Sequence, residues 1–220
     1  MEYVWAVQRP GPPEKVGYGN VTTRQGTGAV VHSAEGSLAS ALAVLESERQ
    51  VSWHFTVSKN GLVYQHYDAS LVCWHAGPKA NPYYVGIECE GLAGEELTSP
   101  QADALCELLR WLHEANNWPP AQRDVTLFEH NHFMATSCPS GRIPWDYVLE
   151  ALQRPPSEPG QPDNGSPAPA SSEAPAAAAE ATLYKVRAFA NAILDLTMEG
   201  NLDHISTADR ALLEETIHRP

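Results

Sequence analysis

Two kinds of hydrophobic pattern alternate along the first 150 residues of the chain. Short apolar runs typical of buried strands are followed by stretches in which apolar residues recur every three or four positions, as on one face of a helix. The runs predict strands at residues 28–32, 51–58, 62–67, 83–90 and 125–129, and the helical spacing predicts helices starting near residues 38, 99 and 144. Asn60-Gly61 between two strand-like runs predicts a β-hairpin. Together these elements predict an α/β fold.

The chain changes character after residue 153. Residues 154–182 consist almost entirely of Pro, Ala, Ser, Gly and Glu, with seven prolines between Pro155 and Pro175, which is typical of an extended linker. Residues 183–220 return to helical spacing and predict a small all-α module. Its core would be thin, so we expect it to bind a partner or to self-associate.

Composition and charge exclude several classes of protein. With 43% hydrophobic and 19% charged residues, the chain is typical of a globular protein. Its 14 basic and 27 acidic residues give a formal charge of -13, which would repel nucleic acid. No apolar run approaches the ~18 residues of a membrane span. The first residues lack the basic start and apolar core of a secretory signal, so we expect cytoplasmic synthesis.

The residues with the richest chemistry are His32, the segment 129–132 and the segment 136–139. Imidazole and thiolate are preferred zinc ligands, and a catalytic zinc takes about three of them while leaving one position for water. Two histidines and Cys138 would complete such a site. Spacing leaves open whether His130 or His132 takes part, because both would face the same side of a strand.

Two other interpretations of these residues are consistent with the sequence. A lone histidine or buried cysteine is more often structural than functional. Cys138 could also act as a peptidase nucleophile with His130 or His132 as its base. The four cysteines are irregularly spaced, which favours thiols or a metal ligand over disulfides.

Four blocks of the sequence resemble the zinc-dependent N-acetylmuramoyl-L-alanine amidases that share their fold with peptidoglycan recognition proteins. The blocks are GAVVHSAEG at 28–36, WHFTVSKNGLVYQ at 53–65, CWHAGPKANPYYVGIECEG at 73–91, and the segment 130–139 with its closing T-x-C-P. The resemblance implies a central mixed β-sheet flanked by helices, with a catalytic domain over residues 1–153.

The resemblance also implies one Zn²⁺, held by His32, His130 and Cys138. It selects His130 over His132, because the family's last two ligands have the spacing of His130 and Cys138. The implied reaction is hydrolysis of the amide between N-acetylmuramic acid and L-alanine of the stem peptide in peptidoglycan.

The catalytic residues that the resemblance implies are Glu88 and Thr136. Glu88 matches the glutamate of the family's G-I-E motif and would be the proton carrier, although a solvated strand carboxylate is the plainer alternative. Glu90 would share its face of the strand. Thr136 stands where many phage enzymes carry lysine, and its hydroxyl would donate to the developing oxyanion.

Four further residues are expected at the substrate cleft: Trp53, Trp74, His75 and Asn81. Another branch of the family carries tyrosine at the position of Trp53. Core packing is the alternative role of Trp74, and turn formation that of Asn81. His75 is expected next to the ligands rather than among them. His54, His66 and His113 are expected to be structural or surface residues.

The linker favours a modular phage endolysin that lyses the host. Because no secretory signal was found, we expect a holin-type partner to permeabilise the membrane before the protein reaches the wall. A cytosolic muropeptide-recycling amidase is the nearest alternative, since it would share the site. A non-catalytic peptidoglycan-recognition module is another, although all three expected ligand positions are intact.

Overall fold

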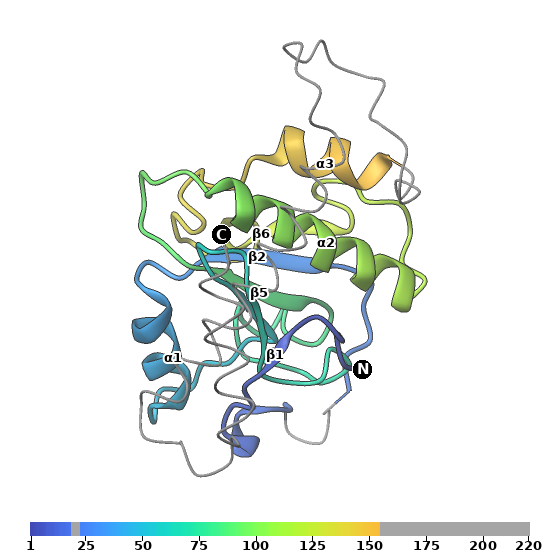
Figure 1. Cartoon of the computed structure of the whole chain (residues 1–220). Coiled ribbons are helices and arrows are strands. Elements are labelled where there is room, and N and C mark those ends of the chain that lie inside the picture. The colour runs from blue at the N-terminus through green and yellow to red at the C-terminus, as the bar shows by residue number, and fades with distance from the viewer. Residues whose placement is uncertain (19–22, 155–220) are drawn as a thin grey trace, which may run out of the picture. The chain divides into compact units, whose positions relative to one another are not determined.

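A six-stranded β-sheet lies at the centre of the computed structural model, which describes residues 1–18 and 23–154 (Figure 1). The strands are β1 (Val7–Gln8), β2 (Ala29–Ser33), β3 (Phe55–Val57), β4 (Val63–Gln65), β5 (Val85–Cys89) and β6 (Leu127–Glu129). They lie in the order β1-β4-β3-β5-β2-β6, and the β3–β4 hairpin is antiparallel while the other pairs are parallel. The expected mixed sheet is confirmed.

The helices of the described residues are α1 (Leu38–Glu46), α2 (Ser99–Ala115) and α3 (Trp145–Gln153), with 3₁₀ turns η1 (Pro13–Lys15) and η2 (His130–His132). Ser37 caps α1 by accepting a hydrogen bond from the Ser40 amide, and Thr98 caps α2 in the same way. In the part of the chain that the structure describes, no helix has the length and apolar character needed to cross a bilayer. The predicted linker (154–182), beyond its first residue, and the helical module (183–220) lie outside the described residues.

One face of the sheet forms the main hydrophobic core. Val31, Phe55 and Ile87 point from this face toward α2 and α3, which lie together over it in Figure 1. In α2 the fully buried leucines recur at helical spacing, namely Leu105, Leu108, Leu109 and Leu112. Burying each leucine contributes about 1.5–3 kcal/mol, so this layer holds the sheet in place.

The opposite face carries a row of polar side chains. In the sheet register His32 of β2 aligns with Glu88 of β5, and Glu88 aligns with Thr56 of β3. Side chains aligned on neighbouring strands point to the same face, so these three cross the sheet side by side. Helix α1 packs through Ala41 and Leu45 in a second hydrophobic cluster with Trp53, Tyr67 and Cys73. This row supplies the polar chemistry of the protein.

A buried arginine joins the strand ends to the loop that follows residue 138. Arg142 is 4% exposed. Its guanidinium donates to the Ser33 hydroxyl (2.9 Å) and to three backbone carbonyls, those of Cys89 (3.2 Å), Glu90 (2.9 Å) and Glu95 (3.0 Å). The charge is therefore stabilised by oxygen atoms from β2, β5 and the loop after β5.

Replacing Arg142 with methionine should lower the free energy of unfolding by about 3 kcal/mol, because it leaves several buried oxygen atoms without donors. Urea denaturation measures the change. Glu150→Ala is the control, since Glu150 pairs with Arg154 on the surface and its loss should cost at most about 0.5 kcal/mol. Equal effects of the two changes would contradict the anchoring role of Arg142.

Candidate metal centre

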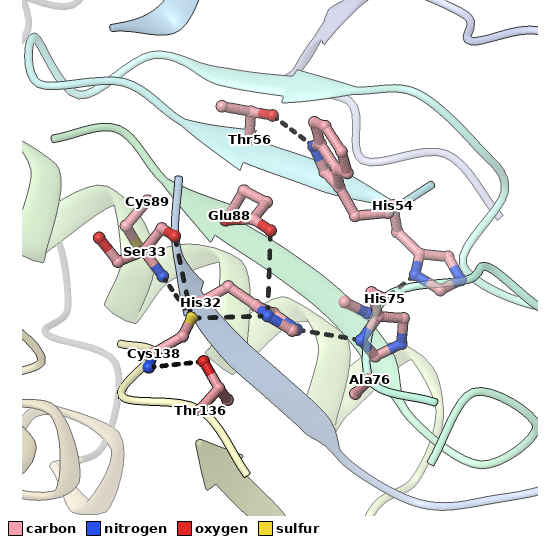
Figure 2. Close-up of polar contacts among 12 residues, drawn as sticks. His32, Ser33, His54, Thr56, His75, Ala76, Glu88, Cys89, Thr136 and Cys138 are labelled. Atoms are coloured by element: carbon pink, nitrogen blue, oxygen red, sulfur yellow. Dashed lines mark hydrogen bonds and ion pairs between the residues drawn. The ribbon is translucent and has the colours of Figure 1, made fainter. Parts of the chain in front are cut away.

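The three expected ligands converge beside the carboxyl end of β2. Val31 aligns with Glu129 of β6, so His130, the next residue, lies beside His32, with ring centroids 4.6 Å apart. The loop after η2 brings the Cys138 sulfur to 3.9 Å from Nδ1 of His32 (Figure 2). One nitrogen or sulfur atom from each of the three lies within 4.8 Å of the others. This is the only such cluster among residues 1–18 and 23–154.

The chemistry of this cluster fits a zinc ion. Two imidazoles and one thiol form a donor set that zinc prefers, and it leaves a coordination position open. Nε2 of His130 is buried and has no hydrogen-bond partner among the described residues. Such an orphaned buried nitrogen is costly unless something binds it. The three side chains can each offer a cation one atom, because these atoms lie within 4.8 Å of one another.

The protonation states also suit a cation. Burial, with His75 and His130 nearby, lowers the pKa of His32 well below its usual range, and burial lowers that of His130. Both rings are therefore neutral, as ligands must be. Burial raises the pKa of the Cys138 thiol to about 12. The Ser33 amide, which donates to the sulfur at 3.3 Å, and a bound cation would both favour the thiolate.

His130 and His132 do not lie on a strand. They lie in η2, a 3₁₀ turn with three residues per turn. Side chains two positions apart in such a turn point in different directions. His132 faces away from the cluster and places Nδ1 3.3 Å from the Asp124 carboxylate. The structure therefore separates the two histidines where strand geometry could not.

Glu88 lies at the edge of the cluster. Its Oε1 is 3.9 Å from Nδ1 of His32, and its Oε2 is buried without a partner among the described residues. Burial, and then the Glu35 carboxylate, raise the pKa of Glu88 to about 8. Glu90 differs, because its two oxygens accept from the Leu38 and Lys59 amides at 3.0 and 2.8 Å. The Glu90 carboxylate therefore stabilises the backbone, whereas Oε2 of Glu88 remains able to take part in chemistry.

Thr136 lies on the exposed side of the same loop. Its hydroxyl oxygen accepts a hydrogen bond from the Cys138 amide at 3.2 Å. Accepting this bond leaves the hydroxyl hydrogen able to donate. The contact holds the Thr136 hydroxyl beside the backbone of Cys138, as Figure 2 shows.

Three of the residues expected at the substrate cleft form hydrogen bonds with other parts of the chain. Trp53 is 5% exposed and donates its indole N–H to Thr56 at 2.8 Å. Trp74 is partly buried and donates to the Gly17 carbonyl at 2.5 Å. Asn81 is 2% exposed and accepts from the amides of His75 and Ala76. Their contacts with substrate stay predictions.

Two residues near the cluster were not predicted from the sequence. The Ser33 amide bonds the Cys138 sulfur, and its hydroxyl is bonded by Arg142. A backbone N–H has no residue signature, and arginine is a typical surface residue. A single sequence therefore carries no signal for either contact.

Buried histidines away from the cluster are structural, as expected. The His54 ring accepts from the Gly86 amide and donates to the Leu71 carbonyl. His66 donates from Nδ1 to the Arg9 carbonyl (2.8 Å) and accepts from the Thr56 hydroxyl (2.9 Å). Both rings have every nitrogen paired, which requires that they be neutral.

Lowering the pH below 6.5 should therefore destabilise the fold. Burial, and then the nearby Arg9 charge, lower the pKa of His66 to about 4, against opposing effects of the hydrogen bond to the Arg9 carbonyl and of Glu46. Between pH 6.5 and 4 the unfolded chain binds a proton at this residue and the folded chain does not, so stability falls as pH falls. The contribution of His66 is about 3 kcal/mol.

Urea denaturation at pH 7, 5.5 and 4.5 measures this slope. His66→Gln should be less stable at pH 7 but show a shallower fall toward pH 4.5. His132 is exposed, so His132→Gln is the control and should keep the full slope. An unchanged slope in His66→Gln would contradict the assignment.

Comparison with known proteins identifies the family. Residues 22–141 match the family model described as N-acetylmuramoyl-L-alanine amidase. The match covers more than half of the 220 residues, and the chain belongs to this family. No curated protein sequence matches the chain.

Solved structures show the same fold. PlyL is 18% identical, with 70% of this chain and 98% of PlyL covered at a TM-score of 0.55. A mutant endolysin from Bacillus subtilis is 21% identical, with 67% of this chain and 97% of the endolysin covered at a TM-score of 0.51. The N-acetylmuramoyl-L-alanine amidase LysC from Clostridium intestinale URNW is 22% identical, with 69% of this chain and 94% of LysC covered at a TM-score of 0.50.

Proposed function

We propose that the protein is a zinc-dependent amidase that cleaves the bond between N-acetylmuramic acid and L-alanine in peptidoglycan. The observation that carries the proposal is the convergence of His32, His130 and Cys138, with Nε2 of His130 buried and unpartnered, in a chain of the N-acetylmuramoyl-L-alanine amidase family. An open three-ligand site is typical of catalytic rather than structural zinc.

The residues around the cluster support a hydrolytic mechanism. His32, His130 and Cys138 would hold one Zn²⁺, which lowers the pKa of water and polarises a carbonyl when bound. Glu88 takes the proton from the attacking water and delivers it to the amine of L-alanine as the amide C–N bond breaks. The Thr136 hydroxyl donates to the carbonyl oxygen as charge develops there. The products are the free lactyl carboxyl group and a stem peptide that begins with L-alanine.

Mass spectrometry of digested peptidoglycan tests the proposal. The protein should release stem peptides that begin at L-alanine, and a chelator should stop the release until zinc is added back. Cleavage at another bond would overturn the substrate assignment. Bound zinc and bound muropeptides without any new ends would instead make the protein a recognition module.

The alternative hypothesis, that Cys138 is a peptidase nucleophile, predicts the opposite response to inhibitors. A thiolate nucleophile would be inactivated by an alkylating reagent and would not need a metal. The zinc amidase should lose activity to the chelator, whereas a thiol alkylator should spare the metal-loaded protein. Inactivation of the metal-loaded protein by the alkylator alone would favour Cys138 as a nucleophile.

We infer that the biological role is that of a phage endolysin. Likeness of fold to an endolysin from Bacillus subtilis supports this role, together with the linker-like composition of residues 154–182. In this proposal a holin-type partner opens the membrane, and residues 183–220 bind the wall or self-associate. Expression in bacteria should cause lysis only after the membrane is permeabilised. Efficient hydrolysis of soluble muropeptides with no action on intact walls would favour a recycling amidase.

A further inference from the structure

His75 connects the metal centre to the backbone of the neighbouring loop. Its Nδ1 lies 3.0 Å from Nε2 of His32 (Figure 2). Its Nε2 lies 3.1 Å from the Tyr84 carbonyl oxygen. Each ring nitrogen of His75 therefore has one partner. Neither partner is a carboxylate, so neither favours a charged ring.

The Tyr84 carbonyl determines which nitrogens carry hydrogen. A carbonyl can only accept, so Nε2 of His75 must donate, and Nδ1 of the neutral ring is then an acceptor. His32 must accordingly donate from Nε2. Its Nδ1 is left with a lone pair, and this atom faces Cys138 and Glu88 at 3.9 Å each.

The position of the His75 ring is fixed independently of any substrate. Asn81 accepts from the amides of His75 and Ala76, at 3.0 and 2.8 Å, which holds the loop. Gly86 leaves the space that the ring fills, since a Cβ at this glycine would lie 2.6 Å from the His75 ring. The ring is therefore held on two sides before a metal arrives.

We propose that His75 is a positioning residue that selects the tautomer of His32 and so presents Nδ1 of His32 to the metal. This role rests on the proposed zinc site. Without an acceptor at His75, the buried Nε2–H of His32 loses its partner. The proton then favours Nδ1, where Glu88 can accept it, and it occupies the lone pair that the metal needs.

Two substitutions separate hydrogen bonding from packing. His75→Leu fills the space without an acceptor, whereas His75→Asn is smaller but places a carbonyl oxygen near the position of Nδ1. We expect His75→Leu to weaken zinc binding roughly 10- to 100-fold and His75→Asn to recover most of that loss. Competition with a chromophoric chelator measures the affinity. His113→Leu, on the last turn of α2, is the control and should bind zinc like the unaltered protein.

Comparing the zinc affinities of His75→Leu and His75→Asn tests the proposal. If His75 acted only by filling space, the larger leucine would be the better replacement, and tighter zinc binding by His75→Leu than by His75→Asn would overturn the proposal. Equal affinity of His75→Leu and the unaltered protein would overturn it as well.

Nuclear magnetic resonance of the metal-free protein provides a readout that needs no activity. Long-range ¹H–¹⁵N spectra of histidine-labelled protein show which ring nitrogen carries hydrogen, and the signal missing in His32→Gln identifies His32. We expect hydrogen on Nε2 of His32 in the unaltered protein. Hydrogen on Nδ1 would overturn the proposal even if the protein hydrolyses peptidoglycan. The expected tautomer in a protein that binds zinc but cleaves nothing would overturn the amidase function and leave the role of His75 intact.

Discussion

Replacing Cys138 with serine should remove most of the bound zinc and abolish hydrolysis of peptidoglycan. The sulfur is one of the three proposed ligand atoms, and a serine hydroxyl is a far weaker zinc ligand than a thiolate. We expect the loss of affinity to exceed the roughly 10- to 100-fold that removal of an outer hydrogen-bond partner costs. Metal analysis by mass spectrometry after dialysis measures the zinc content.

The matched control for this change is Cys106→Ser. Cys106 is a buried thiol of α2 in the main core, 4% exposed, and belongs to no metal cluster of the described residues. It should keep a full complement of zinc despite some loss of stability. Stoichiometric zinc in Cys138→Ser would show that the ligand set has been assigned wrongly.

Replacing Glu88 with glutamine should leave zinc binding intact and lower kcat by about 10²- to 10⁴-fold. Glutamine keeps the shape of the side chain but cannot carry a proton between water and the leaving amine, and this is the range that general acid–base catalysis contributes. Zinc content and the rate of stem-peptide release are measured on the same sample. Glu88→Ala should behave in the same way.

Glu90→Gln separates this effect from a general loss of carboxylate charge. Glu90 lies two residues away and its oxygens accept backbone hydrogen bonds. Its substitution should reduce stability by about 1–2 kcal/mol and change turnover only a few-fold. If Glu88→Gln remained fully active, the proton carrier would be another group.

The sequence predicted the elements well because their signals are local. Apolar runs and helical spacing predicted every strand except β1, and all three helices. β1 was missed, since Val7–Gln8 is too short to form a pattern. The resemblance predicted His32, His130 and Cys138 as ligands, and the structure brings these three side chains together.

What could not be predicted depends on contacts between distant segments. η2 is short, so its geometry follows from the surrounding loop rather than from propensity, and the local pattern could not separate His130 from His132. Trp53 and Asn81 are typical cleft residues in the resemblance, yet both side chains are buried and bond to neighbouring parts of the chain. Burial of this kind is a property of the packed molecule and leaves no mark on local sequence.

The proposed ligands would also tie metal uptake to the completion of synthesis and folding. His32 and Cys138 lie 106 positions apart, and β5, β2 and β6 must pair in register before the two side chains meet. A nascent chain that ends before residue 138 lacks a ligand, and a chain with a displaced β6 misplaces His130. Because metal then binds only the folded form, each tenfold excess of zinc over its Kd stabilises that form by about 1.4 kcal/mol. Zinc retention should thus report on the integrity of the whole domain.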